Sequence, residues 1–417
     1  MRFVRRRWAG AWTMAGALGL STGLVGANPS QGKQPPGQAT TAASSSAITV
    51  AVAVVSVADD ARYLPRQLEK RWPGQPQGRL MDAARLGLAD AELELQEAKL
   101  KVQLREAVAS QASGLDKLLQ QLHKERTLIW LLDLPPELMP QALQAARQLG
   151  VLAINPSSPQ DSLRSQGCDA MVLHTYPSQA MLADAMAQYL AARSWRQVLV
   201  LHGPQPEDQV LAQAWQRAAQ RYGIKTTQTR GFKFSSDPRE RDAGNPRLLT
   251  ADRQHEVVAV WDSEGDFARS LVYATQWPRP VVGSNGLVAQ AWHTQWERYG
   301  APQLNRRFAR QALRPMAGQD WAAWVGIKAL VSAAVMPPAA TGPAPLAARL
   351  RAGEVRMDGF KGLPLSFRAW DGQLRQPIFL GHADGVAGTA PLEGVLHPVD
   401  TLDTLGREDK EQPCLKK

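Results

Sequence analysis

Residues 359–378 read GFKGLPLSFRAWDGQLRQPI, and this stretch decides how the rest of the chain is interpreted. Apolar residues alternate with other residues over 363–367, an Asp371-Gly372 turn follows, and a second apolar run covers residues 374–380. Alternation on both sides of an Asp-Gly pair is typical of two antiparallel strands joined by a tight turn. The sequence therefore predicts a β-hairpin late in the chain.

Strand-like and helix-like segments alternate before this hairpin, beginning with the β-branched run ITVAVAVVSVA at residues 48–58. Further strands are predicted at residues 99–105, 127–132, 151–155, 170–174, 197–202, 224–229, 256–261 and 280–282. Helices are predicted at residues 82–96, 114–124, 140–149, 178–192, 206–222, 266–275, 287–299 and 320–335. This alternation predicts an α/β fold of parallel sheets flanked by helices, and the number of strands favours two sheets over one.

The N-terminus has the pattern of an export signal. MRFVRRRW is followed by an apolar stretch over residues 9–24 and by the small residues Val25-Gly26-Ala27, which predicts a cleaved signal peptide at residues 1–27. A membrane anchor is the alternative, but Gly, Ser and Thr interrupt the apolar stretch. Residues 28–47 are rich in Pro, Gln, Gly, Ser and Thr, which predicts a flexible leader.

Composition excludes some classes of protein. The chain has 417 residues, 44% hydrophobic and 21% charged, as in soluble globular proteins. The formal net charge of +10 falls by four when the arginines of the signal are removed, and Lys and Arg form no stripe interleaved with aromatic residues. We therefore expect no nucleic-acid binding.

Cys168 and Cys414 are the only cysteines. Because disulfides persist in the oxidising space that an exported chain reaches, we predict a Cys168–Cys414 disulfide, with two unpaired thiols as the alternative. No C-x-x-C motif is present, and the seven histidines show no close pairs at metal-ligand spacing.

Catalytic patterns are also missing from the exported sequence. It contains no G-x-S-x-G, H-E-x-x-H, phosphate-binding loop or strand-linked G-x-G-x-x-G motif, so we expect neither an enzyme nor a cofactor or metal. The acidic run DTLDTLGREDKE at residues 400–411 lacks the alternating oxygen ligands of a calcium loop, and we expect a solvated tail there.

Several long segments together resemble one family, the type I periplasmic substrate-binding proteins related to the leucine/isoleucine/valine receptors. These proteins also end in a G-x-x-G, strand, turn, strand element. Within this family, the sequence most resembles the ABC-type substrate-binding proteins associated with PQQ-dependent alcohol dehydrogenase systems. Besides the hairpin, the similar segments are DAARLGLAD (82–90), LHTYPSQAMLADAMAQYL (173–190), WDSEGDF (261–267), PVVGSNGLVAQAWH (280–293) and EGVLHPVDTLDTLG (393–406). The resemblance covers residues 48–414 and departs at residues 89–100, where ADAELELQEAKL replaces a polar loop.

The resemblance implies two lobes joined by three crossings, near His174-Thr175, near Gly283-Ser284 and at residues 353–359. Lobe 1 would combine residues 48–173 and 284–352, lobe 2 would combine residues 174–283 and 353–385, and residues 386–417 would form the C-terminal tail.

The implied function is that of a monomeric periplasmic receptor that closes its lobes on a small polar or amphipathic metabolite. It would present this ligand to an ABC permease in the inner membrane, in a system linked to PQQ-dependent alcohol oxidation. The alternative is a non-transport accessory or sensor protein of the alcohol dehydrogenase system that binds a partner protein or a metal ion.

Candidate ligand-binding residues follow the carboxyl ends of the predicted strands, where open α/β sheets bind ligands. Ser157 and Ser158 follow one strand and either bind a polar oxygen or cap a helix. Thr175, Tyr176 and Ser178 lie at the first crossing, where hydroxyl groups face the ligand in the family; the alternative for Tyr176 is packing at the hinge.

Asp262 and Glu264 follow another strand, and in amino-acid receptors of the family a carboxylate from this region pairs with the ligand ammonium. Capping of the next helix by Asp262 or Ser263 is the alternative. Asn285 is a weaker candidate, with a structural turn as its alternative. Five tryptophans either line an apolar cleft or pack in the core: Trp261, Trp277, Trp292, Trp321 and Trp324.

Overall fold

The computed structural model describes residues 48–71, 73–165, 170–235 and 237–411. The predicted signal peptide and leader lie outside these residues, as do Cys168 and Cys414 with the disulfide proposed between them. In the described ranges, no helix combines the length and the apolar composition that crossing a bilayer requires.

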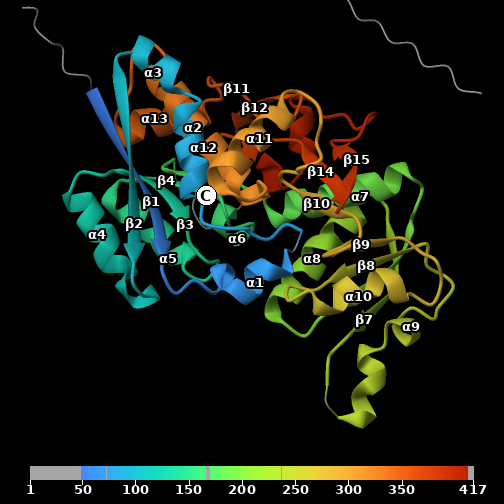
Figure 1. The fold of residues 1–417 in the computed structure, drawn as a ribbon. Coiled ribbons are helices and arrows are strands. Elements are labelled where there is room, and N and C mark those ends of the chain that lie inside the picture. Colours follow the sequence, from blue (N-terminus) through green and yellow to red (C-terminus); the bar gives the residue numbers. More distant parts are fainter. Residues whose placement is uncertain (1–47, 72, 166–169, 236, 412–417) are drawn as a thin grey trace, which may run out of the picture. The chain divides into compact units, whose positions relative to one another are not determined.

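Two parallel sheets form the framework, which confirms the predicted α/β fold (Figure 1). The first has the order β2-β1-β3-β4-β5 and consists of β1 (Ile48–Val57), β2 (Leu100–Ala109), β3 (Ile129–Asp133), β4 (Leu152–Asn155) and β5 (Val172–His174). The second has the order β7-β6-β8-β9 and consists of β6 (Gln197–His202), β7 (Lys225–Gly231), β8 (Val257–Trp261) and β9 (Val281–Gly283). Neighbouring strands are parallel in both sheets.

Helices cover both faces of each sheet, because successive side chains of a strand point to opposite faces. In β1, Val52 and Val54 pack in a core with α2 (Met81–Ala89) and α12 (Gly318–Val335), whereas Ala53 and Val55 pack with α4 (Leu115–Lys124) and α5 (Met139–Leu149) (Figure 1). The helices are α1 (Pro65–Lys70), α2 (Met81–Ala89), α3 (Glu92–Glu97), α4 (Leu115–Lys124), α5 (Met139–Leu149), α6 (Ser162–Ser165), α7 (Gln179–Ala192), α8 (Pro206–Arg221), α9 (Pro246–Leu249), α10 (Asp266–Ala274), α11 (Ala301–Ala312), α12 (Gly318–Val335) and α13 (Pro343–Arg351). The four-stranded sheet follows the same rule, with α7 and α8 on one face and α10 on the other.

The late hairpin is present, but its second strand is shorter than predicted. β12 (Pro364–Phe367) pairs antiparallel with β13 (Leu374–Arg375) on one side and with β11 (Met357–Asp358) on the other. Pro377 has no N–H to donate to a ladder, and the chain leaves the hairpin there. It continues as β14 (Ile378–His382), which pairs with β15 (Gly385–Ala390) and with β10 (Val288–Gln290).

The helix predicted at residues 287–299 is wrong. Its first residues form β10, which pairs with β14, and the following residues form turns before α11 begins at Ala301. Local helical spacing is overridden here because β14 offers an open edge to which β10 adds. The helix predicted at residues 82–96 is interrupted between α2 and α3.

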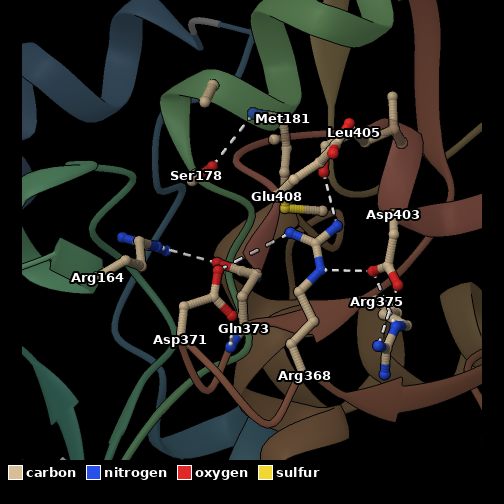
Figure 2. A network of polar contacts seen from close by, with 12 residues as sticks. Arg164, Ser178, Met181, Arg368, Asp371, Gln373, Arg375, Asp403, Leu405 and Glu408 are labelled. Carbon is tan, nitrogen blue, oxygen red and sulfur yellow. Dashed lines mark hydrogen bonds and ion pairs between the residues drawn. The ribbon is translucent and has the colours of Figure 1, made fainter. Parts of the chain in front are cut away.

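The acidic C-terminal run is packed against the protein, contrary to the solvated tail that we expected. Leu402, Asp403 and Leu405 are buried. Arg368 Nε donates to Asp403 Oδ1 at 2.8 Å, and Arg368 Nη2 donates to the carbonyl oxygens of Leu402 and Leu405 (Figure 2). Arg375 also bonds Asp403, through Nε at 2.9 Å and Nη2 at 3.0 Å. Two arginines of the hairpin region therefore fix the end of the described chain.

Replacing the shared carboxylate tests this attachment. Asp403→Asn removes the carboxylate that Arg368 and Arg375 share and leaves Arg368 only the longer contact to Asp371, 3.9 Å from its Nη1, so we expect the free energy of unfolding to fall by about 3 kcal/mol. Urea unfolding followed by circular dichroism measures the change. Glu240→Gln, which removes the exposed Lys233–Glu240 ion pair, is the control and should leave the midpoint unchanged. An Asp403→Asn protein as stable as this control would contradict the structural role.

Candidate ligand-binding cavity

A cavity of ≈ 270 Å³ lies where the carboxyl ends of strands from both sheets meet. Loops after β1, β3 and β4 border it from the five-stranded sheet, and the ends of β8 and β9, with the start of α8 after β6, border it from the four-stranded sheet. This is the location at which open α/β sheets bind ligands. The wall residues in these positions are Arg62, Pro136, Ser157, Pro159, Gln160, Glu207, Trp261, Asp262, Ser263, Gly283 and Ser284.

Other elements complete the wall, mostly with apolar surface. α7 contributes Leu182, Ala183 and Met186, and β10 contributes Val288 and Ala289. The remaining wall residues are Pro73, Gly74, Gln75, Pro76, Tyr176, Gln179, Leu211, Ala214 and Gln319. The cavity is thus predominantly hydrophobic with a few polar groups, as small-molecule sites generally are.

The serine loop after β4 is held in shape by Asn155. Asn155 Oδ1 accepts from the backbone N–H of Ser157 at 3.2 Å and of Ser158 at 2.8 Å. The Ser157 hydroxyl reaches the carbonyl oxygens of Leu132 and Leu134 at 3.4 and 3.3 Å. Ser157 lies on the wall, whereas Ser158 is buried away from it. The hydroxyl of Ser157 therefore joins β3 to β4 as well as bordering the cavity.

Hydroxyl groups at the predicted first crossing are also engaged within the chain. Tyr176 is buried on the wall, and its hydroxyl donates to the Gly74 carbonyl at 3.2 Å; burial raises its pKa. Thr175 bonds the carbonyl oxygen of Asn155. Ser178 caps α7 by accepting from Met181 N–H at 3.1 Å (Figure 2). Of these three residues, the structure places Tyr176 on the wall.

Asp262 lies on the wall but caps a helix, one of the alternatives that the sequence left open. Its two carboxylate oxygens accept from Gly265 N–H at 2.6 Å and from Ala268 N–H at 2.9 Å, at the start of α10. Burial raises the pKa of Asp262. Glu264 accepts from Gln205 Nε2, and Asn285 accepts from the adjacent Gly286 N–H; neither belongs to the wall as described.

Arg62 is a wall residue that sequence reasoning missed. Its guanidinium binds Asp60 through Nε at 3.1 Å and Nη2 at 2.6 Å, and Nη2 also reaches Asp133 Oδ1 at 3.1 Å. The surrounding ARYLP matches no binding motif, and the one signal for Arg62 was its position after the first strand. Gln319 carried no such signal, because it lies in the first turn of a helix far along the chain.

The tryptophans divide between packing and the cavity. Trp292, Trp321 and Trp324 are buried in the core beside the five-stranded sheet. Trp277 is half-buried outside the cavity wall, and its Nε1 donates to the Ala251 carbonyl at 2.9 Å. Trp261 is the member of the predicted group on the wall. Across the described ranges, His, Cys, Asp and Glu form no group of three or more suited to a metal ion.

No protein-family model and no curated protein matches the sequence, but solved structures match the fold. A leucine-, isoleucine-, valine-, threonine- and alanine-binding protein from Brucella ovis, in its closed conformation, aligns with a TM-score of 0.67 at 11% identity, over 88% of this chain and 98% of its own. An ABC transporter substrate-binding protein from Desulfitobacterium hafniense in complex with Leu has a TM-score of 0.62 at 15% identity, over 81% and 99%. A solute-binding protein of an ABC transporter from R. palustris in complex with benzoate has a TM-score of 0.58 at 12% identity, over 82% and 96%. The chain has the periplasmic-binding-protein fold.

In this periplasmic-binding-protein fold, His174 supports the serine loop from the end of β5. Asn155 Nδ2 donates to the Ser158 carbonyl at 2.9 Å and lies 3.1 Å from His174 Nδ1. Because Asn155 Oδ1 already accepts two N–H groups, its amide nitrogen must face His174, and His174 Nδ1 must accept. Burial, reinforced by Arg164 and Arg351, lowers the pKa of His174 well below 6.5. The imidazole is therefore neutral in the folded protein.

A pH-dependent stability difference follows from this neutral histidine. Below pH 6.5 the unfolded chain protonates His174 while the folded protein does not, so stability falls as the pH decreases. On changing from pH 7.5 to 5.5, we expect wild type to lose about 1 kcal/mol more unfolding free energy than His174→Gln, which has no such proton to bind. Urea unfolding at both pH values measures this difference. Equal losses in the two proteins would show that His174 titrates alike in both states.

Proposed function

We propose that this protein is a periplasmic solute-binding receptor that encloses a small polar or amphipathic metabolite and presents it to an ABC permease. The observation that carries the proposal is the cavity bordered by the carboxyl ends of strands from both sheets. The similar structures named above are binding proteins, two of them in complex with Leu and with benzoate, which supports binding rather than catalysis.

Contacts beside the cavity join the two sides and support closure around a ligand. Lys70 Nζ of α1 lies 3.3 Å from Asp266 Oδ1 of α10, and Arg269 Nη2 donates to the Lys70 carbonyl at 2.7 Å. The Gly74 carbonyl accepts from both Tyr176 and Gln319. A ligand that touches both sheet edges would favour this arrangement over a more open one.

The proposed lobes follow the two sheets. β1–β4 fall in lobe 1, residues 48–173 and 284–352, and β6–β9 fall in lobe 2, residues 174–283 and 353–385. The proposed receptor is monomeric and acts after export to the periplasm. The similar segments quoted from the sequence support its link to PQQ-dependent alcohol oxidation.

Filling the cavity tests the proposal without knowledge of the ligand. Ala183 lies on the wall in α7, and Ala183→Phe places a ring in the cavity; Ala192→Phe adds the same ring at the exposed end of the same helix. We expect native mass spectrometry of protein from its own periplasm to find one retained small molecule in wild type and Ala192→Phe. Ala183→Phe should lower its occupancy by about tenfold or more.

Two results would contradict the proposed function. One is equal occupancy in Ala183→Phe and wild type, which would place the molecule elsewhere. The other is wild-type protein that carries no molecule and gains none when incubated with periplasmic extract.

A further inference from the structure

We infer that the cavity takes an uncharged amphipathic molecule, such as an amide or an alcohol with a branched or aromatic carbon skeleton, and not a zwitterionic amino acid. This inference rests on the proposed function and names its class of ligand. It depends on the charge balance of the wall, in which three of the described residues carry charged side chains: Arg62, Glu207 and Asp262.

Among its described residues, the wall offers no unpaired buried carboxylate for a ligand ammonium. Both oxygens of Asp262 are committed to the N–H groups that begin α10. Glu207 is exposed in the first turn of α8, where water screens its charge. An ammonium group moved from water into this cavity would lose its hydration and meet only a buried carboxylate whose charge two N–H groups already stabilise, which is unfavourable.

The wall is equally poor for a ligand carboxylate. Arg62 is the cation on the wall, and it is already paired with Asp60 and Asp133, whose side chains are 0% and 1% exposed. Arg79 Nη1 lies 3.7 Å from Asp60, so two arginines and two buried aspartates balance one another. A carboxylate placed against Arg62 would also meet the two aspartates, and their repulsion offsets the attraction.

The remaining polar groups of the wall suit a neutral ligand. Trp261 Nε1, Gln160 Oε1 and Gln319 Oε1 are buried and have no hydrogen-bond partner among the described residues. The side chains that carry these atoms belong to the wall, beside the apolar surface of α7 and β10, and a ligand that reaches them would meet one donor and two acceptors. A hydroxyl or primary amide can both accept from an indole N–H and donate to an amide oxygen. Satisfying such buried groups stabilises a complex because leaving them unpaired is costly.

Matched ligands that differ in charge test the class directly. We would titrate dialysed wild-type protein by calorimetry with 3-methylbutanamide, 3-methylbutanoate, 3-methylbutylamine and leucine, and with benzamide, benzoate, benzylamine and phenylalanine. In at least one series, the amide should bind about tenfold or more tightly than each charged member.

Trp261→Phe keeps an aromatic ring but removes the donor, and should weaken amide binding about fivefold. Trp277→Phe, which alters an indole outside the cavity, should leave the dissociation constant within about twofold.

Three results would overturn the inference: a charged member that binds most tightly, amide binding that Trp261→Phe leaves unchanged, or no amide binding in either series. The proposed function is judged separately by the molecule retained in native mass spectrometry. A retained amino acid would refute the neutral class while leaving the receptor function in place. An empty protein that also ignores both series would refute both.

Discussion

The backbone carbonyl groups of residues 174–176 must find hydrogen-bond donors away from water, because the chain is buried where it leaves β5 for α7. Side chains of the late hairpin provide most of them. Gln373 Nε2 donates to His174 O at 3.1 Å and to Tyr176 O at 3.0 Å, and Gln376 Nε2 donates to Thr175 O at 2.8 Å. Arg164 Nη2 adds a bond to Tyr176 O at 2.8 Å. The path between the two sheets therefore depends on a segment about two hundred residues later.

This polar support continues from the hairpin into the C-terminal segment and the serine loop. Arg164 Nε also bonds Gln373 Oε1, while Arg368 and Arg375 share Asp403 (Figure 2). Because these groups are buried and paired, removal of one leaves its partner unsatisfied. The network fixes residues 174–176 and hence Tyr176, which stands on the cavity wall. Stability of the hairpin and shape of the cavity are thus linked through named hydrogen bonds.

The sequence pattern was enough to predict elements whose structure depends mainly on neighbouring residues. The β-branched run at residues 48–58 and the Asp371-Gly372 turn were sufficient to predict a buried strand and a hairpin, and both are present. Residues 287–299 were misjudged because β10 forms by pairing with β14, a partner that helical spacing does not reveal. The burial of Leu402 and Asp403 likewise depends on Arg368, which no property of the acidic run indicates.

Some residues of the cavity wall could be predicted from the sequence, and others depend on contacts between distant segments. Ser157 and Asp262 reach its wall because they directly follow β4 and β8, so the strand-end rule was enough to find them. Gln319 and the loop at residues 73–76 reach it through packing between distant segments, whereas Arg62 follows the carboxyl end of β1. The committed hydrogen bonds of Asp262 and the ion pairs of Arg62 also follow only from three-dimensional structure. The fold alone says nothing about the charge of the ligand, and these contacts are the evidence for a neutral one.

If one ligand is held by the strand ends of both sheets, hydrogen exchange should report it at both sets of loops. Protein carrying its retained molecule would be compared with protein from which the molecule has been removed. We predict slower exchange in the bound form at residues 73–76 and 157–160 and, together with them, at residues 261–263 and 283–284. Protection confined to the loops of one sheet, or to a surface away from all four segments, would contradict it.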